Sequence, residues 1–326
     1  MRELVVRVGT RSSDLALWQA NHVIERLEGA TQGLRCERVP IRTLGDRVKD
    51  VPLPRFGDRG LFTREIESAL RAGTIDVAVH SLKDLPTDEP GDLTVAAVLE
   101  REDPRDVLVS ATGGTLDSLP AGARVGTSSM RRRAQILARR PDLQLLDIRG
   151  NVPTRLEKIR RGDYDATLLA LAGLKRLGLA AAASELFAVD RLLPAPGQGA
   201  LAAQVRTADA SVREIVSRLD HVPTRQATSA ERALLTILDG GCQAPLGAFA
   251  DWIAAGRLSL DAIVLNDTGT RVLRATAEQP VESVDDALAL AGKIAALLDE
   301  QGAGAILAAC RQKWSDESRP SVEELA

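Results

Sequence analysis

This sequence of 326 residues contains few cysteines and no long apolar run, and each shortage excludes a class of protein. The three cysteines, Cys36, Cys242 and Cys310, are far apart and form no CxxC pattern, which argues against a disulfide framework or a zinc site. No apolar run approaches the roughly 18–20 residues of a membrane span. The N-terminus, MRELVVRVGT, lacks the apolar segment of a signal peptide. We therefore expect a cytoplasmic protein that contacts no membrane and binds no metal ion.

Aromatic residues are scarce as well, at 2% of the chain, and the net charge is −3. The arginines at 131–133 could contact nucleic acid, but the sequence offers no aromatic platform for base stacking and no long basic stripe. It also contains no GxGxxG, P-loop, HExxH or GxSxG motif. Dinucleotide-binding, NTPase, zinc-protease and hydrolase functions therefore lack their usual signatures. We expect no nucleic-acid partner.

Strands and helices alternate through the first 200 residues, and the chain is too long for one typical domain. The apolar patterns predict strands at 4–8, 37–42, 75–79, 93–98, 124–126, 143–148, 165–170 and 201–205, and helices at 14–27, 61–71 and 171–177 and from about 129 and 151. Pro40 places the second strand at an edge or a bulge. The alternation predicts βαβ units and largely parallel sheets.

Two irregular segments, EREDPRD (100–106) and LLPAPGQGA (192–200), divide this series and predict paired connections between two lobes. We predict an α/β protein with two doubly wound lobes. The first would comprise residues 1–99 and 200–220, and the second residues 105–193. Helical patterns at 225–238, 284–298 and 303–313 and strand patterns at 258–264 and 270–275 then predict a smaller C-terminal α+β domain, residues 221–326.

The loops at the predicted carboxyl ends of the strands are where ligands gather in open α/β sheets. These loops supply Arg11, Ser13, Lys83, Asp84, Thr127, Ser128, Ser129, Arg131, Arg132, Arg149, Arg155 and Arg176. A single hydroxyl-rich loop is more often a helix cap. Five such loops together predict a cradle for several carboxylates or phosphates, because helix N-termini and arginines both favour anions.

Two further residues carry chemistry. Asp84 is an acid in an otherwise cationic set of loops, and a carboxylate there suits stabilising a transient positive charge or moving a proton at nitrogen. A cap of the turn before Pro86 is the structural alternative. Cys242, in DGGCQAPLG, follows a glycine pair in a loop where a thiol is expected to face outward.

The motifs GTRSSDLALWQA, GDRGLFTREIE, AVHSLKDLPT, EREDPRD, GTSSMRRRAQ, RGNVPTRL, LAGLKRLGL, LPAPGQGA and GGCQAPLG run from residue 9 to residue 247. Together they resemble the hydroxymethylbilane synthase (porphobilinogen deaminase) family. The resemblance implies a transferase of porphyrin and haem biosynthesis that condenses four porphobilinogen molecules, with loss of ammonia, into hydroxymethylbilane. It also implies lobes like those of periplasmic binding proteins, a monomer, and a dipyrromethane cofactor attached to Cys242 through a thioether.

The resemblance implies roles for single residues too. The catalytic set is Asp84, Arg11, Arg149 and Arg155, and the substrate carboxylates would bind Arg11, Arg149, Arg155 and Arg176. The cofactor set is Cys242, Lys83, Asp84, Ser13, Thr127, Ser128, Ser129, Arg131, Arg132 and Gln198. Arg55 and Arg59 stand where related enzymes often have lysine, which keeps the charge but changes its geometry.

Two other functions fit a two-lobed architecture, because fold does not fix function. One is an anion receptor, either a periplasmic solute-binding protein or the effector domain of a regulator. The other is a degenerate enzyme that binds its substrate without turning it over. The receptor needs neither Cys242 nor Asp84, and the presence of both residues disfavours the degenerate enzyme.

Overall fold

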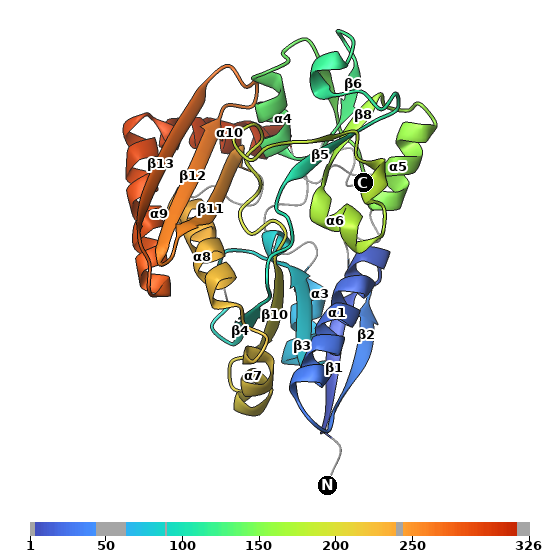
Figure 1. Cartoon of the computed structure of the whole chain (residues 1–326), viewed down its shortest axis with the longest axis vertical. Helices are drawn as coiled ribbons and strands as arrows, with labels where there is room; N and C mark the ends of the chain where they lie inside the picture. Colours follow the sequence, from blue (N-terminus) through green and yellow to red (C-terminus); the bar gives the residue numbers. More distant parts are fainter. Residues whose placement is uncertain (1–3, 44–62, 89, 239–243, 318–326) are drawn as a thin grey trace.

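The computed structural model describes residues 4–43, 63–88, 90–238 and 244–317, with side chains described as far as Lys313. Within these ranges the strands form two five-stranded sheets and one three-stranded sheet. Figure 1 shows the first sheet at one end of the molecule, the second at the other, and the C-terminal sheet with its helices beside both. None of the described helices is long and apolar enough to cross a membrane.

The first sheet contains strands from the start of the chain and one strand that returns from far along it. Its elements are β1 (Leu4–Arg11), α1 (Asp14–Ala30), β2 (Leu34–Ile41), α3 (Arg64–Arg71), β3 (Val77–Ser81), the 3-10 turn η2 (Leu82–Asp84), β4 (Leu93–Val98), β10 (Leu201–Arg206) and α7 (Ala210–Ser217). The strand order is β2-β1-β3-β10-β4. Pro40 lies on β2, an edge strand, as predicted.

The second sheet repeats this plan with the order β7-β6-β8-β5-β9. Its elements are β5 (Asp106–Ser110), η3 (Leu116–Ser118), β6 (Arg124–Gly126), α4 (Met130–Leu137), β7 (Gln144–Leu146), α5 (Val152–Arg160), β8 (Ala166–Ala170), α6 (Leu171–Arg176), η4 (Ala180–Ala182) and β9 (Glu185–Leu186). Pro153 stands in the first turn of α5, where its missing N–H costs no hydrogen bond.

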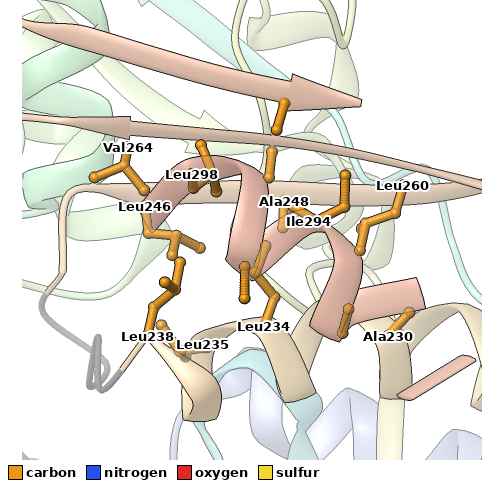
Figure 2. Close-up of a cluster of buried hydrophobic side chains, with 14 of the residues drawn as sticks. Ala230, Leu234, Leu235, Leu238, Leu246, Ala248, Leu260, Val264, Ile294 and Leu298 are labelled. Carbon is orange, nitrogen blue, oxygen red and sulfur yellow. The ribbon is translucent and has the colours of Figure 1, made fainter. Parts of the chain in front are cut away.

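The C-terminal part packs helices against a three-stranded antiparallel sheet. Its elements are α8 (Val222–Ile237), β11 (Leu246–Ala254), β12 (Arg257–Leu265), β13 (Val272–Pro280), α9 (Val284–Glu300) and α10 (Ala303–Glu317). Figure 2 shows leucines of α8 meeting side chains of β11, β12 and α9 in one apolar cluster. The core includes Leu238 and Leu246, which precede and follow residues 239–243 in the chain.

The predicted α/β class with a C-terminal α+β part is confirmed, and so are the strands at 4–8 and 93–98 and the helices at 14–27 and 284–298. The domain boundaries stay a prediction. The prediction of largely parallel sheets is wrong. Each of the two larger sheets combines two parallel pairings with two antiparallel ones. The sequence patterns also missed β5, β11 and α7. In the case of β5, the reason is that it follows directly on a charged segment that is typical of a connection.

The antiparallel strands decide which residues reach the ligand edge, meaning the edge of each sheet that bears the predicted ligand-binding loops. β5 pairs with β8 in the register Asp106–Ala170, so the amino end of β5 lies at the carboxyl end of β8. β10 pairs with β3 in the register Leu201–Ser81, so the residues just before β10 lie at the carboxyl end of β3. Each sheet therefore presents strand ends of both kinds at one edge.

The two connections between the lobes run side by side. The Leu99 N–H donates to the Leu201 carbonyl at 3.0 Å, and the Glu102 N–H donates to the Gly199 carbonyl at 3.3 Å. Gly199 has φ +94°, and a Cβ at this position would lie 2.2 Å from the Glu102 carbonyl oxygen. Glycine is therefore required at this close approach.

Candidate functional site

Cationic side chains of the second lobe gather around Lys83 of the first. Lys83 donates from Nζ to Oε1 of Gln198 at 3.2 Å. Burial lowers the pKa of Lys83 to about 8; Asp84 and Asp106 act against this, and Arg132 and Arg131 add to it. These groups are therefore electrostatic neighbours, although they come from η2, from the start of β5 and from α4.

Asp106 lies at the centre of this group and is fully buried. Its carboxylate accepts hydrogen bonds from Arg131 Nη1 at 2.7 Å, Arg132 Nη2 at 2.7 Å and Gln198 Nε2 at 2.9 Å. Burial by itself would raise the pKa of Asp106, but the charges and hydrogen bonds of the two arginines hold that pKa far below its usual range. The cluster therefore carries two fixed positive charges and one fixed negative charge.

Both arginines keep a buried donor without a partner. Arg131 also donates to the Leu193 carbonyl at 2.7 Å, and Arg132 to the Leu168 carbonyl at 2.9 Å. The Nε atoms of both side chains are buried and find no acceptor among the described residues. An unsatisfied buried donor costs about 1–3 kcal/mol, and more when it is charged. Two such donors on neighbouring residues indicate a site for an anionic ligand.

Arg155 and Arg149 extend the positive charge toward Asp84. Burial, with Arg132 and Arg149 next in size, lowers the pKa of Arg155 to about 10, while Asp84 opposes that shift. Burial also lowers the pKa of Arg149. Asn151 caps α5 and accepts from the Thr154 N–H, and Arg155 Nε donates to the Gly150 carbonyl at 2.9 Å. The cap and this bond fix the base of the Arg155 side chain.

Asp84 is the last residue of η2, and its side chain is exposed. It makes no hydrogen bond or ion pair within the described part of the chain, and it influences the pKa values of Lys83 and Arg155. The carboxylate therefore does not cap the turn before Pro86. It is an anion held among cations with its oxygens open to a ligand.

The four predicted hydroxyl residues make local contacts in this structure. Ser13 caps α1 and Ser129 caps α4, each accepting from a backbone N–H of its helix. Ser128 Oγ donates to the Ile148 carbonyl at 2.9 Å, and Thr127 Oγ1 accepts from the Ser129 N–H at 3.2 Å. These side chains shape the helix N-termini at the ligand edge. Whether they also touch a ligand stays a prediction.

Arg11 and Arg176 belong to the inner side of the first lobe and to the lobe junction. Arg11 lowers the pKa of the buried His80, whose value falls to about 4 mainly through burial. Arg176 donates to the Gly199 carbonyl at 2.6 Å and lies over the Trp18 ring at 5.8 Å. Burial lowers the pKa of Arg176 to about 10, and Glu102 acts against this. In this structure Arg176 therefore joins the two lobes.

Three predicted residues, Cys242, Arg55 and Arg59, lie outside the described residues. Sequence reasoning missed Asp106, which belongs to EREDPRD and was treated there as part of a connection. The signal that could have identified it is the apolar strand pattern DVLVS, which begins with Asp106, the last residue of that motif. Among the described residues no cluster of histidine, cysteine, aspartate and glutamate could hold a metal ion.

Comparison with known structures finds periplasmic proteins of low sequence identity. The BvgS VFT2 domain of Bordetella pertussis has a TM-score of 0.40 at 15% identity, covering 66% of this chain and 86% of that chain. A TRAP periplasmic solute binding protein from Pseudomonas putida F1, with bound D-glucuronate, has a TM-score of 0.39 at 10% identity, covering 67% and 78%.

Comparison of the sequence is more specific. Residues 6–214 match the family model "Porphobilinogen deaminase, dipyromethane cofactor binding domain", and residues 226–300 match "Porphobilinogen deaminase, C-terminal domain". The porphobilinogen deaminase of Pelotomaculum thermopropionicum is 47% identical over 94% of this chain and 97% of its own length. That of Desulforudis audaxviator is 49% identical over 95% and 99%. This chain therefore belongs to the porphobilinogen deaminase family.

Proposed function

We propose that this chain catalyses the hydroxymethylbilane synthase reaction of tetrapyrrole biosynthesis, in which porphobilinogen molecules are joined head to tail with release of ammonia. The observation that carries the proposal is the pair of buried, unpartnered Nε donors of Arg131 and Arg132 within a cationic group that includes one open carboxylate, Asp84. A substrate rich in carboxylates that becomes cationic during reaction needs both features.

The residues present fit a dipyrromethane cofactor. Each pyrrole of that group carries an acetate and a propionate, and carboxylates are the acceptors that a guanidinium edge binds best. Arg131, Arg132 and Lys83 would hold these carboxylates, and Cys242 would provide the thioether attachment. The bound cofactor supplies a fixed pyrrole end to which the first substrate is joined. The orphaned Nε atoms are the structural support for this assignment.

The remaining arginines would bind and orient substrate. Arg155 lies close to Asp84 in electrostatic terms, and Arg149 lies close to Arg155. A porphobilinogen carboxylate on these arginines would therefore place its aminomethyl group near the open acid. Arg11 would contribute from the first lobe. Arg176 would bind carboxylate only after giving up its contacts to Gly199 and Trp18.

Asp84 would stabilise the charge that develops on the substrate. When the C–N bond of the protonated aminomethyl group breaks, its electron pair leaves with nitrogen as ammonia and the positive charge passes to the substrate carbon. A carboxylate beside that carbon lowers the energy of the charged state, because the opposite charge is already in place when the cation forms. Oδ1 or Oδ2 of Asp84 can also accept a hydrogen bond from the pyrrole N–H of the substrate.

Intact-protein mass spectrometry tests the function directly. Protein purified from cells that make porphobilinogen should carry the extra mass of two linked porphobilinogen-derived units, and Cys242→Ser should lack it. The purified enzyme should consume porphobilinogen and release ammonia. An unmodified wild-type chain that leaves porphobilinogen unconsumed would contradict the proposal and favour a two-lobed anion receptor.

We further propose that the chain acts as a monomer in the cytoplasm, with lobes at 1–99 plus 200–220 and 105–193 and a third domain at 221–326. Support comes from the two sheets and the paired connections between them. Light scattering at micromolar concentration should give the mass of one chain. Limited proteolysis should cut first near these boundaries.

A further inference from the structure

Asp106 holds three groups that the proposed function assigns to the cofactor. Arg131 and Arg132 occupy different oxygens of its carboxylate, and Gln198 shares Oδ1 with Arg132. All four side chains are buried, with Asp106 and Gln198 at 0% exposure. One fully buried carboxylate therefore fixes two guanidinium groups and one amide at the same edge of the second sheet.

The contacts that Asp106 makes leave a particular edge of Arg131 unused. A guanidinium binds a carboxylate in bidentate fashion through Nε and one Nη. Arg131 donates to Asp106 and Leu193 through Nη1 alone. Its Nε is buried without an acceptor, and no described residue accepts from Nη2. Asp106 thus binds the Nη1 group of Arg131 and leaves the edge formed by Nε and Nη2 available to another carboxylate.

Asp106 also allows two like charges to lie together in a buried place. Burial lowers the pKa of Arg131, and Arg132 lowers it further, while Asp106 acts in the opposite direction. Without the carboxylate, the two guanidinium groups would repel each other and turn apart. With it, both are held on one acid while their Nε donors remain unpaired.

The influence of Asp106 extends across the lobe boundary through Gln198. The amide of Gln198 donates from Nε2 to Asp106 and to the Pro104 carbonyl, the latter at 2.6 Å. Its Oε1 accepts from Lys83 Nζ. Because Nε2 is committed to acceptors on one side, Oε1 must face the lysine. Asp106 therefore sets the orientation of the amide that receives Lys83 of the first lobe.

We propose that Asp106 is a positioning residue, which orients Arg131, Arg132 and, through Gln198, Lys83 for binding the carboxylates of cofactor and substrate. This role rests on the function proposed above. Asp106 itself touches no substrate, because its oxygens are enclosed by the groups that it holds.

The test compares Asp106→Asn with Asp76→Asn. Asp76 is the matched control, because its carboxylate also holds two arginines, Arg7 and Arg206, at the start of β3 and away from the ligand edge. Intact-mass measurement gives the fraction of chains that carry cofactor. Steady-state assays with porphobilinogen, made on the cofactor-bearing fraction, give kcat and KM separately.

Asp106→Asn should reduce the cofactor-bearing fraction and raise KM at least about ten-fold, the effect of losing one charge-assisted hydrogen bond, with kcat per cofactor-bearing chain changed less than KM. Asp76→Asn should keep the wild-type cofactor fraction, KM and kcat. An Asp106→Asn enzyme with wild-type KM and cofactor content would overturn the proposal.

A second readout does not depend on the reaction. The pH dependence of Lys83 acetylation by acetic anhydride, followed by peptide mass spectrometry, gives a midpoint that can be compared between wild type and variant. The midpoint should fall in Asp106→Asn, because Asp106 raises the pKa of Lys83. An unchanged midpoint would contradict the link between Asp106 and Lys83. If the wild type fails to consume porphobilinogen but the midpoint still falls in Asp106→Asn, the proposed function is rejected and the positioning role of Asp106 is not.

Gln198→Leu keeps the experiment decisive if Asp106→Asn does not fold. It leaves both ion pairs of Asp106 in place and removes only the amide between Asp106 and Lys83. KM should rise about three-fold or more, with a lower labelling midpoint for Lys83. Wild-type values for both quantities would overturn the proposal.

Discussion

Asp76 and Asp106 each hold two arginines, and these two clusters differ in which donors they leave unpaired. Asp76 pairs with Arg7 and Arg206 in the first lobe, and Asp106 pairs with Arg131 and Arg132 in the second. In the first cluster, Nε and Nη2 of Arg7 both donate to Asp76, so the bidentate edge is filled. In the second, the corresponding edge of Arg131 has no acceptor.

The clusters also differ in exposure and place. The side chains of Arg7 and Arg206 are 39% and 24% exposed, whereas those of Arg131 and Arg132 are 5% and 8% exposed. Asp76 precedes β3, at the edge opposite the strand ends that bear the loops, while Asp106 lies beside the carboxyl end of β8. A satisfied pair at the outer edge stabilises the fold. A buried, incomplete pair at the strand ends that bear the loops fits the binding site proposed above.

The largest effect should come from Asp84, a carboxylate that belongs to neither cluster. Asp84→Asn should lower kcat about 10²–10³-fold, the usual effect of removing one preorganised electrostatic group at a reacting centre. KM should change little, since the arginines are intact. Thermal unfolding should be unchanged, because Asp84 makes no described hydrogen bond. The rate of ammonia release at saturating porphobilinogen measures kcat. A wild-type rate in Asp84→Asn would show that Asp84 has no catalytic role.

Replacing one arginine in each cluster by lysine should separate their roles. Arg131→Lys keeps the charge beside Asp106 but loses the Nε edge, so kcat/KM for porphobilinogen should fall about 10–100-fold. Arg7→Lys should leave kcat/KM unchanged and lower the melting temperature instead. Equal loss of kcat/KM in both variants would show that the two clusters do not differ in function.

Removing the Asp76 carboxylate should lower the free energy of unfolding by an amount that depends on pH. Burial raises the pKa of Asp76, but the hydrogen bonds from Arg7 and Arg206 outweigh it and lower the pKa overall. We expect Asp76→Asn to reduce the free energy of unfolding by about 1–3 kcal/mol at neutral pH, an amount moderated by the partial exposure of the arginines.

The pH dependence follows from the sign of that shift. A carboxyl whose folded pKa is depressed stabilises the fold above its unfolded pKa of about 3.9, and this contribution is lost as the pH falls through the folded pKa. The difference between wild type and Asp76→Asn in urea unfolding should therefore be constant above about pH 5 and shrink below about pH 4. A difference that grew on acidification would contradict the ion-pair assignment.

The smallest effect should come from the helix cap Ser129, at the start of the helix that carries Arg131 and Arg132. Ser129→Ala should destabilise the protein by about 1 kcal/mol, because the Arg132 N–H loses its acceptor, and Ser129→Asn should restore most of that loss. Urea unfolding measures both. If Ser129→Asn restores stability but not the KM for porphobilinogen, the hydroxyl also contacts ligand.

Much of the candidate site could be predicted from the sequence. The loops that carry Lys83, Asp84, Arg131 and Arg155 follow apolar strand patterns, and this local signal is strong because buried strands must be apolar. The structure brings these four residues into electrostatic contact. Asp106 was missed, because the charged segment EREDPRD was interpreted as a connection and the short strand DVLVS that begins with Asp106 was overlooked.

The sequence by itself determined the alternating elements, the anion-binding loops at the strand ends and the family motifs, all of which depend on residues near one another in the chain. Only the tertiary structure decided that β5 and β10 run antiparallel to their neighbours, which brings Asp106 and Gln198 to the ligand edge. It also decided that Arg176 joins the lobes through Gly199. Strand direction here depends on how the chain returns between lobes, and such long-range pairing leaves no periodic pattern in the sequence.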